Sequence, residues 1–491
     1  MPALSTDEIA DPHVIVLIGA TGDLARRKLL PGLLHLFRAG LAADTRIVGT
    51  SLDDLTPDEF VEMARQACQV DSNRKVDDAA WREFASRLTY VPSGKGPQAL
   101  ADAVAEAEHT LSAETSGGPV CYLHYLSVPP SAALPAVLSL QEAGLVERAR
   151  IIMEKPFGTD LESARKLNHE LHQVFAEEQI FRIDHFLGKE AAQNILAFRF
   201  ANGLFEPIWN RNHIDHVQID VPETLGLEGR ESFYEATGAY KDMVVTHLFQ
   251  VLAFMAMESP TSLEPGPIGE EKNKVFRSMR PIEPRHVIRG QFGGYRERDD
   301  VSVDSDTETF VALRAEIDNW RWAGVPFFLR TGKKLAESAR IISIAFKEPP
   351  RTMFPPGSGV GALGPDHLTF DLADSSRMSL SFYGKRPGPG FKLDKLSMQF
   401  ALHESSYAGA GLEAYERLIH DAMRGDHTLF TKAEGIESLW ELSRPLLANP
   451  PPVRIYQPGT WGPNAIHQII APHAWRLPFE RAWRRPDPLA E

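Results

Sequence analysis

The sequence predicts an α/β plus α+β protein with two domains. The N-terminal domain is expected to hold a Rossmann-type, doubly wound parallel sheet, because strand-like runs alternate with helical patterns there. The C-terminal domain is expected to be an α+β domain around a large, mainly antiparallel sheet, because strand-like runs cluster between helices. We place the first domain at residues 1–184 and the second at 185–491.

Length and composition agree with this division and exclude several classes of protein. A chain of 491 residues is too long for one ordinary core, and its 43% hydrophobic and 24% charged residues are typical of soluble globular proteins. A net charge of −14 argues against nucleic-acid or anionic-membrane surfaces. Only two cysteines are present, and the acidic N-terminus lacks the apolar core of a signal peptide. No apolar run approaches the roughly 20 residues of a membrane span, so we expect a soluble, cytoplasmic protein.

The first strand of the N-terminal domain runs into a glycine turn. Residues 14–18 are apolar and end at Gly19-Ala20-Thr21-Gly22-Asp23-Leu24-Ala25, after which apolar residues recur at helical spacing. Strand, glycine turn and helix form the setting of a dinucleotide site, since glycines let the backbone approach the pyrophosphate at the helix N-terminus. The turn is a variant of the common motif, because a threonine and a leucine replace glycines. It predicts binding of NAD or NADP by Gly19, Thr21, Gly22, Asp23 and Leu24.

The rest of the N-terminal domain continues the alternation. Further strands are predicted at 46–50, 120–128 and 149–153, and helices at 57–69, 79–87, 97–113 and 131–143. The last strand leads into Glu154-Lys155-Pro156-Phe157-Gly158, where the proline forces a turn. Ligands of such sheets lie beyond the carboxyl ends of the strands. Lys155 is therefore placed to contact the cofactor or an anionic substrate, although a single lysine is more often a solvated one.

An acid, an imidazole and a lysine follow the apolar pair Ile180-Phe181 within a few positions. They are Asp184, His185 and Lys189. Where a strand passes into a helix, free N–H groups and the helix dipole favour anions. The i to i+4 spacing predicts His185 and Lys189 on one helix face, where two cations can hold one phosphate. The alternative is a solvated loop with a surface ion pair, and these residues alone leave that choice open.

The C-terminal domain combines long helices with a group of strands. Helices are predicted at about 231–257, 411–424 and 432–447, loops at 351–365 and 384–390, and strands at 285–293, 307–317, 325–331, 339–347, 366–371 and 377–383. The first of these helices carries Asp242 and His247, five positions apart, which an α-helix does not bring into line. A histidine in such an apolar helix is, taken alone, more often a core residue. Residues 326–334 form a strand and a glycine turn that presents lysines.

These motifs together resemble the glucose-6-phosphate dehydrogenase family. Residues 19–25, 154–158, 182–190, 242–247 and 329–333 occur in the order and spacing of that family, and further matches lie at 415–426 and 461–463. The resemblance covers nearly the whole chain. It implies oxidation of glucose 6-phosphate at C1 to 6-phosphoglucono-lactone with hydride transfer to NAD or NADP, the first oxidative step of the pentose phosphate pathway. It also implies dimerisation through the large sheet, hence a homodimer or a dimer of dimers.

The resemblance implies a role for each matching side chain. His247 would be the general base for the anomeric hydroxyl, and Asp184 would orient its imidazole. No metal is implied, because hydride transfer from an alcohol needs only a base and an acceptor ring. The implied binding residues are His185 and Lys189 for the phosphate, Glu223 and Asp242 for sugar hydroxyls, Lys333 and Lys155 for cationic contacts with substrate and cofactor, and Lys28 near the start of the first helix.

Three positions depart from the family pattern. Phe186 replaces a tyrosine near the phosphate, and Ser338 replaces a cationic residue. The third departure is Leu52 and Asp53, where NADP-using members carry an arginine. A carboxylate accepts hydrogen bonds from a free ribose 2′-hydroxyl and repels a 2′-phosphate, so Asp53 predicts that NAD is favoured. The alternative is that Asp53 caps the next helix and Arg26 or Arg27 serves the 2′-phosphate.

Two other functions compete with this interpretation. A sugar dehydrogenase of the glucose–fructose oxidoreductase type also uses a Glu-Lys-Pro turn, but it does not need the pair His185 and Lys189. A non-catalytic nucleotide-binding sensor would keep the fold and lose the base. The presence of both Asp184 and His247 argues against the sensor.

Overall fold

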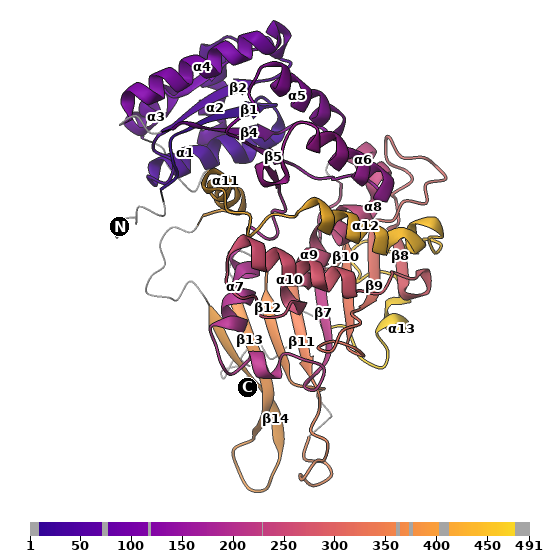
Figure 1. The fold of residues 1–491 in the computed structure, drawn as a ribbon. Helices are drawn as coiled ribbons and strands as arrows, with labels where there is room; N and C mark the ends of the chain where they lie inside the picture. Colours follow the sequence, from indigo (N-terminus) through magenta and orange to yellow (C-terminus); the bar gives the residue numbers. More distant parts are fainter. Residues whose placement is uncertain are drawn as a thin grey trace. The chain divides into compact units, whose positions relative to one another are not determined.

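The computed structural model describes residues 9–70, 77–115, 119–227, 229–359, 364–372, 377–401 and 412–476. The chain divides into two compact units, which are described separately (Figure 1). The first comprises Met1–Gly188, Pro260–Glu270 and Gly409–Glu437, and the second comprises Lys189–Ser259, Glu271–Ala408 and Ser438–Glu491. The predicted single boundary after residue 184 did not include the two later segments that return to the first unit.

The first unit contains a six-stranded parallel sheet with the order β3-β2-β1-β4-β5-β6. This order is that of a Rossmann fold and confirms the predicted doubly wound sheet. Its strands are short and apolar, and the central strand β1 is almost fully buried, as a parallel sheet requires. The strands are β1 His13–Ile18, β2 Thr45–Thr50, β3 Leu88–Tyr90, β4 Cys121–Leu126, β5 Ala149–Met153 and β6 Ile180–Arg182.

The helices of the first unit follow the strands closely. One helix corresponds to each of the helices predicted at 57–69, 79–87, 97–113 and 131–143. The short strand β3 and the helix α6 were not predicted, since the apolar pattern of each is weak. The helical segments are η2 Ala25–Leu29, α1 Leu30–Arg38, α2 Pro57–Val70, α3 Asp78–Ala85, η3 Ser93–Lys95, α4 Gly96–Glu114, α5 Pro130–Glu142, α6 Leu161–His172 and η4 Glu177–Gln179.

Helix α11 (Ala414–Arg424) returns to the first unit late in the chain. Oxygen atoms of α11 accept hydrogen bonds from side chains of the Rossmann fold. His35 Nδ1 lies 2.8 Å from Glu416 Oε2, and Arg150 Nη1 donates to the carbonyl oxygen of Ala422 (3.2 Å). Arg150 also donates to the carbonyl oxygen of Met423, one of the last carbonyls of the helix. These contacts depend on residues more than two hundred positions apart, so local sequence patterns could not predict them.

The second unit is built on a nine-stranded sheet with the order β14-β13-β12-β11-β7-β10-β9-β8-β15. Six of its eight strand pairs are antiparallel and two are parallel, β7 with β10 and β8 with β15, which confirms the predicted mainly antiparallel sheet. Strand β13 continues two residues into the predicted loop 384–390. The strands are β7 Ile214–Pro222, β8 Val287–Phe292, β9 Phe310–Glu316, β10 Pro326–Gly332, β11 Ile341–Phe346, β12 His367–Asp371, β13 Arg377–Lys385, β14 Leu393–Ala401 and β15 Arg454–Tyr456.

The predicted helix 231–257 is three segments rather than one. It consists of α8 Glu231–Ala239, the π-helix η6 Tyr240–Leu248 and α9 Phe249–Ala256, with a break at Gly238 (φ 67°, ψ 171°). Hydrophobic periodicity alone does not register such a break. In the described part of the chain, no helix is both long and apolar enough to cross a membrane. The remaining helical segments are α7 Glu190–Phe200, η5 Glu206–Ile208, α10 Pro265–Ser278, η7 Pro284–His286, α12 Ala433–Ala448 and α13 Ile466–Ile470.

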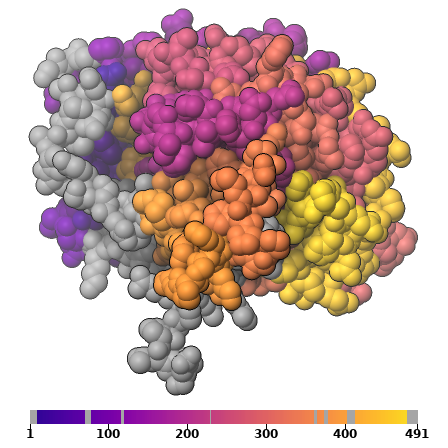
Figure 2. Space-filling model, turned by 90° about the horizontal axis from the view of Figure 1, so that it is seen from below, coloured from indigo at the N-terminus to yellow at the C-terminus, as the bar shows by residue number. Residues whose placement is uncertain are grey.

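The segment that ends the described chain lies on the sheet of the second unit. Gln218 on β7 donates its amide to the carbonyl oxygen of Ala474 (3.0 Å). The Trp475 ring centre is 4.5 Å from the guanidinium carbon of Arg330 on β10. Figure 2 shows the yellow surface of this segment beside the orange surface of the later strands. Residues 474 and 475 therefore pack against the sheet of this unit.

Candidate functional site

The predicted glycine turn follows β1, and its first glycine is required by the fold. Gly19 has φ 82°, and a Cβ there would lie only 2.1 Å from the carbonyl oxygen of Ser127, after β4. Any side chain would displace that backbone, so only glycine fits. The Gly22 N–H closes the turn on the Gly19 carbonyl (3.0 Å). The turn therefore keeps the backbone close to the sheet edge where a pyrophosphate would approach.

A cavity of about 530 Å³ opens at this edge, at the carboxyl ends of β1, β2 and β4. Its polar lining includes the glycine turn and the residues that follow β2, while apolar groups such as Leu100 and Val128 form much of the rest. A concave, largely apolar cavity with a few polar groups is the usual form of a cofactor site. The predicted residues that line it are Gly19, Thr21, Gly22, Leu52 and Asp53.

Asp53 turns its side chain toward the glycine turn. Thr21 donates its hydroxyl to Asp53 Oδ2, and Tyr90 donates its hydroxyl to the Asp53 carbonyl oxygen (2.6 Å). The next helix, α2, is capped by others: Glu59 Oε2 accepts from both the N–H and the hydroxyl of Thr56 (2.8 and 2.9 Å). The alternative in which Asp53 caps this helix is therefore wrong. Its carboxylate stays at the cavity wall.

Four other predicted cofactor residues, Asp23, Leu24, Lys28 and Lys155, lie outside the cavity lining. Leu24 is half-buried where η2 begins, and Asp23 is an exposed partner of Arg27 at 3.4 Å. Lys28 Nζ lies 3.0 Å from Glu413 Oε2, and both side chains are about half exposed. Such a surface pair contributes little stability, so a ligand phosphate could replace Glu413 as the partner of Lys28.

Glu154, just after β5, is a carboxyl group for which no role was predicted. Tyr125 on the neighbouring strand β4 donates its hydroxyl to Glu154 Oε1 (2.5 Å). Burial raises the pKa of Glu154 to about 7, and the Asp184 carboxylate adds to this rise, while Tyr125 and the Lys155 ammonium oppose it. Glu154 thus takes up or releases a proton near neutral pH, at the edge of the sheet where the predicted site lies.

Replacing Glu154 by glutamine is expected to flatten the pH dependence of stability. The folded pKa of about 7 lies above the reference value of 4.5, so the stability due to this proton is present below about pH 4.5 and lost as the pH rises through about 7. The loss is at most roughly 3 kcal/mol, at about 1.36 kcal/mol per pKa unit. Glutamine keeps the volume of the side chain, and its amide oxygen can still accept a hydrogen bond from the Tyr125 hydroxyl.

Urea unfolding at about pH 5 and about pH 8 measures this difference. Wild type should lose more unfolding free energy between the two pH values than Glu154→Gln does. Asp421→Asn serves as a comparison, because burial also raises the pKa of Asp421 to about 7. An identical loss in wild type and Glu154→Gln would contradict the assignment.

The segment from Asp184 to Lys189 is a turn, not the start of a helix. Asp184 Oδ1 accepts from the Phe186 N–H (2.9 Å), and the Asp184 carbonyl accepts from the Leu187 N–H (3.1 Å). A short acidic side chain that bonds to the backbone in this way competes with helix formation. Helix α7 begins at Glu190, with Lys189 as its extended N-cap residue. The prediction that His185 and Lys189 share one helix face is therefore wrong.

His185 is held against aromatic side chains within the first unit. Its ring lies parallel to that of Tyr415 on α11, with centroids 6.0 Å apart and planes 10° apart. Phe186, which stands where the family usually has tyrosine, is buried beside it. Asp184 is buried and His185 is half-buried, and a carboxylate oxygen of Asp184 lies within 4.8 Å of a ring nitrogen of His185.

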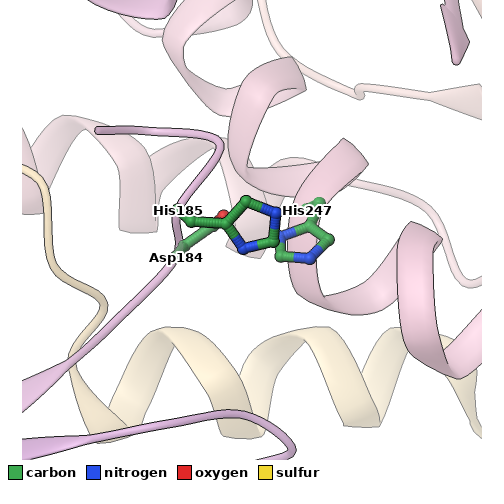
Figure 3. A group of neighbouring side chains, drawn as sticks. All are labelled: Asp184, His185 and His247. Atoms are coloured by element: carbon green, nitrogen blue, oxygen red, sulfur yellow. The ribbon is translucent and has the colours of Figure 1, made fainter. Parts of the chain in front are cut away.

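In the second unit, Asp242 and His247 lie on the π-helix η6, and both are buried. Figure 3 draws His247 on this helix and Asp184 with His185 on the segment after β6. A π-helix is hydrogen-bonded from i to i+5, so residues five apart lie about one turn apart. The prediction that Asp242 and His247 do not line up assumed an α-helix, and the π-helix brings them closer to one face.

Two more predicted substrate residues meet at the ends of the parallel strands β7 and β10. Lys333 donates its ammonium group to the Glu223 carboxylate, and the Glu223 N–H bonds to the Gly332 carbonyl oxygen (2.9 Å). Tyr456 donates its hydroxyl to the Lys333 carbonyl oxygen (2.6 Å). Ser338, which replaces a cationic residue of the family, accepts from the Thr224 N–H (3.0 Å). It supports the loop rather than adding charge.

A second group of titratable side chains lies at the start of β7. Asp215 Oδ2 is 2.9 Å from His216 Nδ1 and 3.3 Å from His473 Nδ1. The Gln218 amide nitrogen faces His216 Nε2 (3.0 Å), because its Oε1 accepts from the Arg476 N–H (2.8 Å). His216 Nε2 is then the acceptor and Nδ1 carries the proton. A metal ion at Nδ1 would have to displace that proton, so this group favours a hydrogen-bonded network over a metal centre.

Comparison with known proteins identifies the family. The model of the glucose-6-phosphate dehydrogenase NAD-binding domain matches residues 16–194, and the model of the C-terminal domain of the same enzyme matches residues 196–484. The chain belongs to the glucose-6-phosphate dehydrogenase family. The resemblance predicted from the motifs is thereby confirmed, and it extends over both units.

Individual members of the glucose-6-phosphate dehydrogenase family are similar over nearly their whole length. The enzyme of Rhizobium meliloti (strain 1021) is 40% identical, with 94% of this chain and 96% of the relative aligned. Glucose-6-phosphate 1-dehydrogenase 1 of Mycobacterium tuberculosis (strain ATCC 25618 / H37Rv) is 38% identical over 95% and 96%.

Two solved structures of the same family agree with this fold. A glucose-6-phosphate 1-dehydrogenase from Mycobacterium avium is 36% identical, with a TM-score of 0.83 over 96% of this chain and 99% of its own. A glucose-6-phosphate dehydrogenase in complex with its substrate glucose-6-phosphate is 32% identical, with a TM-score of 0.87 over 96% and 100%.

Proposed function

We propose that this protein oxidises glucose 6-phosphate at C1 to 6-phosphoglucono-lactone, with hydride transfer to NAD or NADP. It is an oxidoreductase acting on a CH–OH group, at the first oxidative step of the pentose phosphate pathway. The observation that carries this proposal is membership of the glucose-6-phosphate dehydrogenase family over residues 16–194 and 196–484. A 32% identical relative was solved with glucose-6-phosphate as its substrate.

We propose His247 as the general base and Asp184 as the carboxylate that orients it. The imidazole would take the proton of the C1 hydroxyl, and the carboxylate would stabilise the imidazolium that results. The nicotinamide cofactor, when bound, supplies the acceptor for the hydride that leaves C1. Each of the two side chains is buried in its own unit, and charged groups interact more strongly away from water.

The remaining predicted residues are proposed as binding groups. His185 and Lys189 would hold the phosphate, and Lys333 and Lys155 would place positive charge near the substrate and the cofactor. Glu223 and Asp242 would accept hydrogen bonds from sugar hydroxyls. The ion pair between Lys333 and Glu223 supports the assignment of these two residues to one site. A sugar that bonds to both would meet a lysine that is already oriented.

We propose that the cofactor lies in the cavity at the ends of β1, β2 and β4, with Lys28 and the turn residues Asp23 and Leu24 at its entrance. Asp53 at the cavity wall supports a preference for NAD. Its carboxylate already accepts from Thr21, and it would accept equally from a ribose 2′-hydroxyl, whereas it would repel a 2′-phosphate.

The double variant Leu52→Arg/Asp53→Ser is expected to shift the ratio of kcat/KM values toward NADP by at least about tenfold, or ~1.4 kcal/mol. Leu52 is 95% exposed, so arginine there can reach a 2′-phosphate without disturbing the core. Initial rates with each cofactor measure the ratio, and Asp54→Ser, one position further along, is the matched control. An unchanged ratio, or wild-type enzyme that strongly prefers NADP, would show that the 2′ site lies elsewhere.

Initial-rate assays test the function itself. We expect rapid oxidation of glucose 6-phosphate and much slower oxidation of glucose. Equal rates with both sugars would favour a dehydrogenase of the glucose–fructose oxidoreductase type, and no turnover with either would favour a nucleotide-binding sensor.

We also propose that the protein acts in the cytoplasm as a homodimer or a dimer of dimers. Strand β14 is an edge strand on which three large apolar side chains are exposed, and such patches are typical of interfaces. Their exposed fractions are 49% for Leu396, 45% for Met398 and 53% for Phe400. Sedimentation analysis would give the oligomeric state.

A further inference from the structure

Helix η6, which carries Asp242 and His247, begins at a break that another element holds in place. Gly238 has φ 67°, a conformation that favours glycine. A Cβ at this position would lie 2.6 Å from Glu308 Oε1 and 3.0 Å from its Cδ. The carboxylate therefore occupies the space where a side chain would otherwise project. Glu308 comes just before β9, seventy residues later in the chain.

Glu308 accepts from two amides at the point where α8 passes into η6. Its carbonyl oxygen accepts from the Ala239 N–H (2.9 Å), and its Oε1 accepts from the Tyr240 N–H (3.0 Å). The first N–H groups of a helix have no partner within the helix, and they are usually capped by the residue just before it. Here the cap comes from the segment just before β9. The start of η6 is thus fixed relative to the sheet rather than to α8.

The carboxylate of Glu308 is itself held rigidly by Arg289 on β8. Glu308 Oε2 accepts from Arg289 Nε (3.0 Å) and Nη2 (2.8 Å), and both side chains are buried. Arg289 also donates to the carbonyl oxygens of Asp306 (2.6 Å) and Pro451 (2.9 Å). Arg289 Nε and Nη2 both bond to the same carboxylate oxygen, so the other oxygen, Oε1, is left to accept from the Tyr240 N–H. The position of the first turn of η6 is therefore determined by the sheet.

The side chain of Tyr240 holds the same turn through a contact with α12. Its hydroxyl lies 2.8 Å from the Ser443 hydroxyl on α12, and the Ser443 hydroxyl donates to the Leu439 carbonyl oxygen (2.7 Å). The Tyr240 N–H bonds to Glu308 and the Tyr240 hydroxyl bonds to Ser443. Because both its backbone and its side chain are held, rotation of Tyr240 about the helix axis is restricted. His247 follows seven positions later on the same continuous helix.

We propose that Glu308 is a positioning residue for catalysis, which sets the rotation of η6 and through it the placement of the His247 imidazole. This inference rests on the proposed role of His247 as the general base. A small displacement of a catalytic group by a distant change can lower turnover by up to about 100-fold. Glu308 would act in this way, without touching the substrate.

Glu308→Gln is the direct test, because glutamine keeps the shape but cannot serve both partners. If its oxygen faces Arg289, its amide nitrogen opposes the Tyr240 N–H, and in the other orientation it opposes the guanidinium. We expect kcat to fall by about 10- to 100-fold. Asp306→Asn is the matched control, since Asp306 Oδ2 lies 3.2 Å from Arg289 Nη1 and the Asp306 side chain is 62% exposed. The kcat of Asp306→Asn should stay within about twofold of the wild-type value.

A double-variant cycle separates positioning from general destabilisation. If Glu308 acts through His247, Glu308→Gln should lower kcat by less than about threefold in a His247→Asn background, because the group it positions is already gone. A loss as large as in wild type, or a Glu308→Gln enzyme with normal kcat, would overturn the positioning role while leaving the base in place. Near-normal turnover of His247→Asn alone would overturn the base and the positioning role together.

A second variant serves if Glu308→Gln does not fold, as judged by thermal unfolding and by cofactor binding to the first unit. Glu308→Asp keeps the charge for Arg289 and withdraws the carboxylate from Tyr240 by one methylene. We expect a lower kcat there as well, again absent in the His247→Asn background. A folded Glu308→Asp enzyme with wild-type kcat would overturn the proposal.

Discussion

His247→Asn is expected to lower kcat by ~10²–10⁴-fold, the usual effect of losing a general base. The imidazole is 1% exposed on η6, and asparagine can fill much of its space without accepting the hydroxyl proton at neutral pH. The KM for glucose 6-phosphate should change little, because the phosphate contacts are proposed to come from other residues. Initial-rate kinetics with saturating cofactor measure both constants.

The control for this variant is His467→Asn, which changes an exposed histidine on α13 of the same unit. It should leave kcat and thermal stability unchanged. If folded His247→Asn turned over substrate at nearly the wild-type rate, the base would have to be another group. In that case the carboxyl of Glu154, whose pKa is about 7, would be the first alternative to examine.

The Rossmann sheet and the glycine turn could be predicted because their causes are local. A buried parallel strand is a short apolar run in the sequence. Gly19 stands at a turn whose backbone conformation favours glycine over other residues. The same holds for most strands of the large sheet. The short strands β3 and β15 have three residues each, which is too few to show a period.

Other features depend on contacts that periodicity does not record. The i to i+4 spacing of His185 and Lys189 indicates a helix only if the backbone is free to form one, and the Asp184 side chain bonds to that backbone instead. The start of η6 likewise involves a contact that is distant in sequence, because Glu308, just before β9, accepts from the Tyr240 N–H. The chemistry of the site residues was therefore easier to predict from the sequence than their arrangement.

Lys189→Ala is expected to raise the KM for glucose 6-phosphate by roughly 10- to 150-fold, which corresponds to the 1.5–3 kcal/mol of a charge-assisted hydrogen bond. Lys189 is the N-cap residue of α7, so its ammonium group and the helix N-terminus both favour an anion at this point. Alanine removes the charge and leaves the helix end. kcat at saturation should change much less, because binding to a remote phosphate is nearly equal in the ground and transition states.

Glucose is the decisive comparison substrate for this variant, because it lacks the phosphate. Lys189→Ala should leave the slow oxidation of glucose almost unchanged, and the loss should be confined to glucose 6-phosphate. Lys166→Ala, an exposed lysine on α6 of the first unit, controls for the loss of one positive charge from the protein and should affect neither substrate. Proportional losses with both sugars would mean that Lys189 supports the fold of the site rather than binding the phosphate. The phosphate would then have to be held by His185 together with another cation.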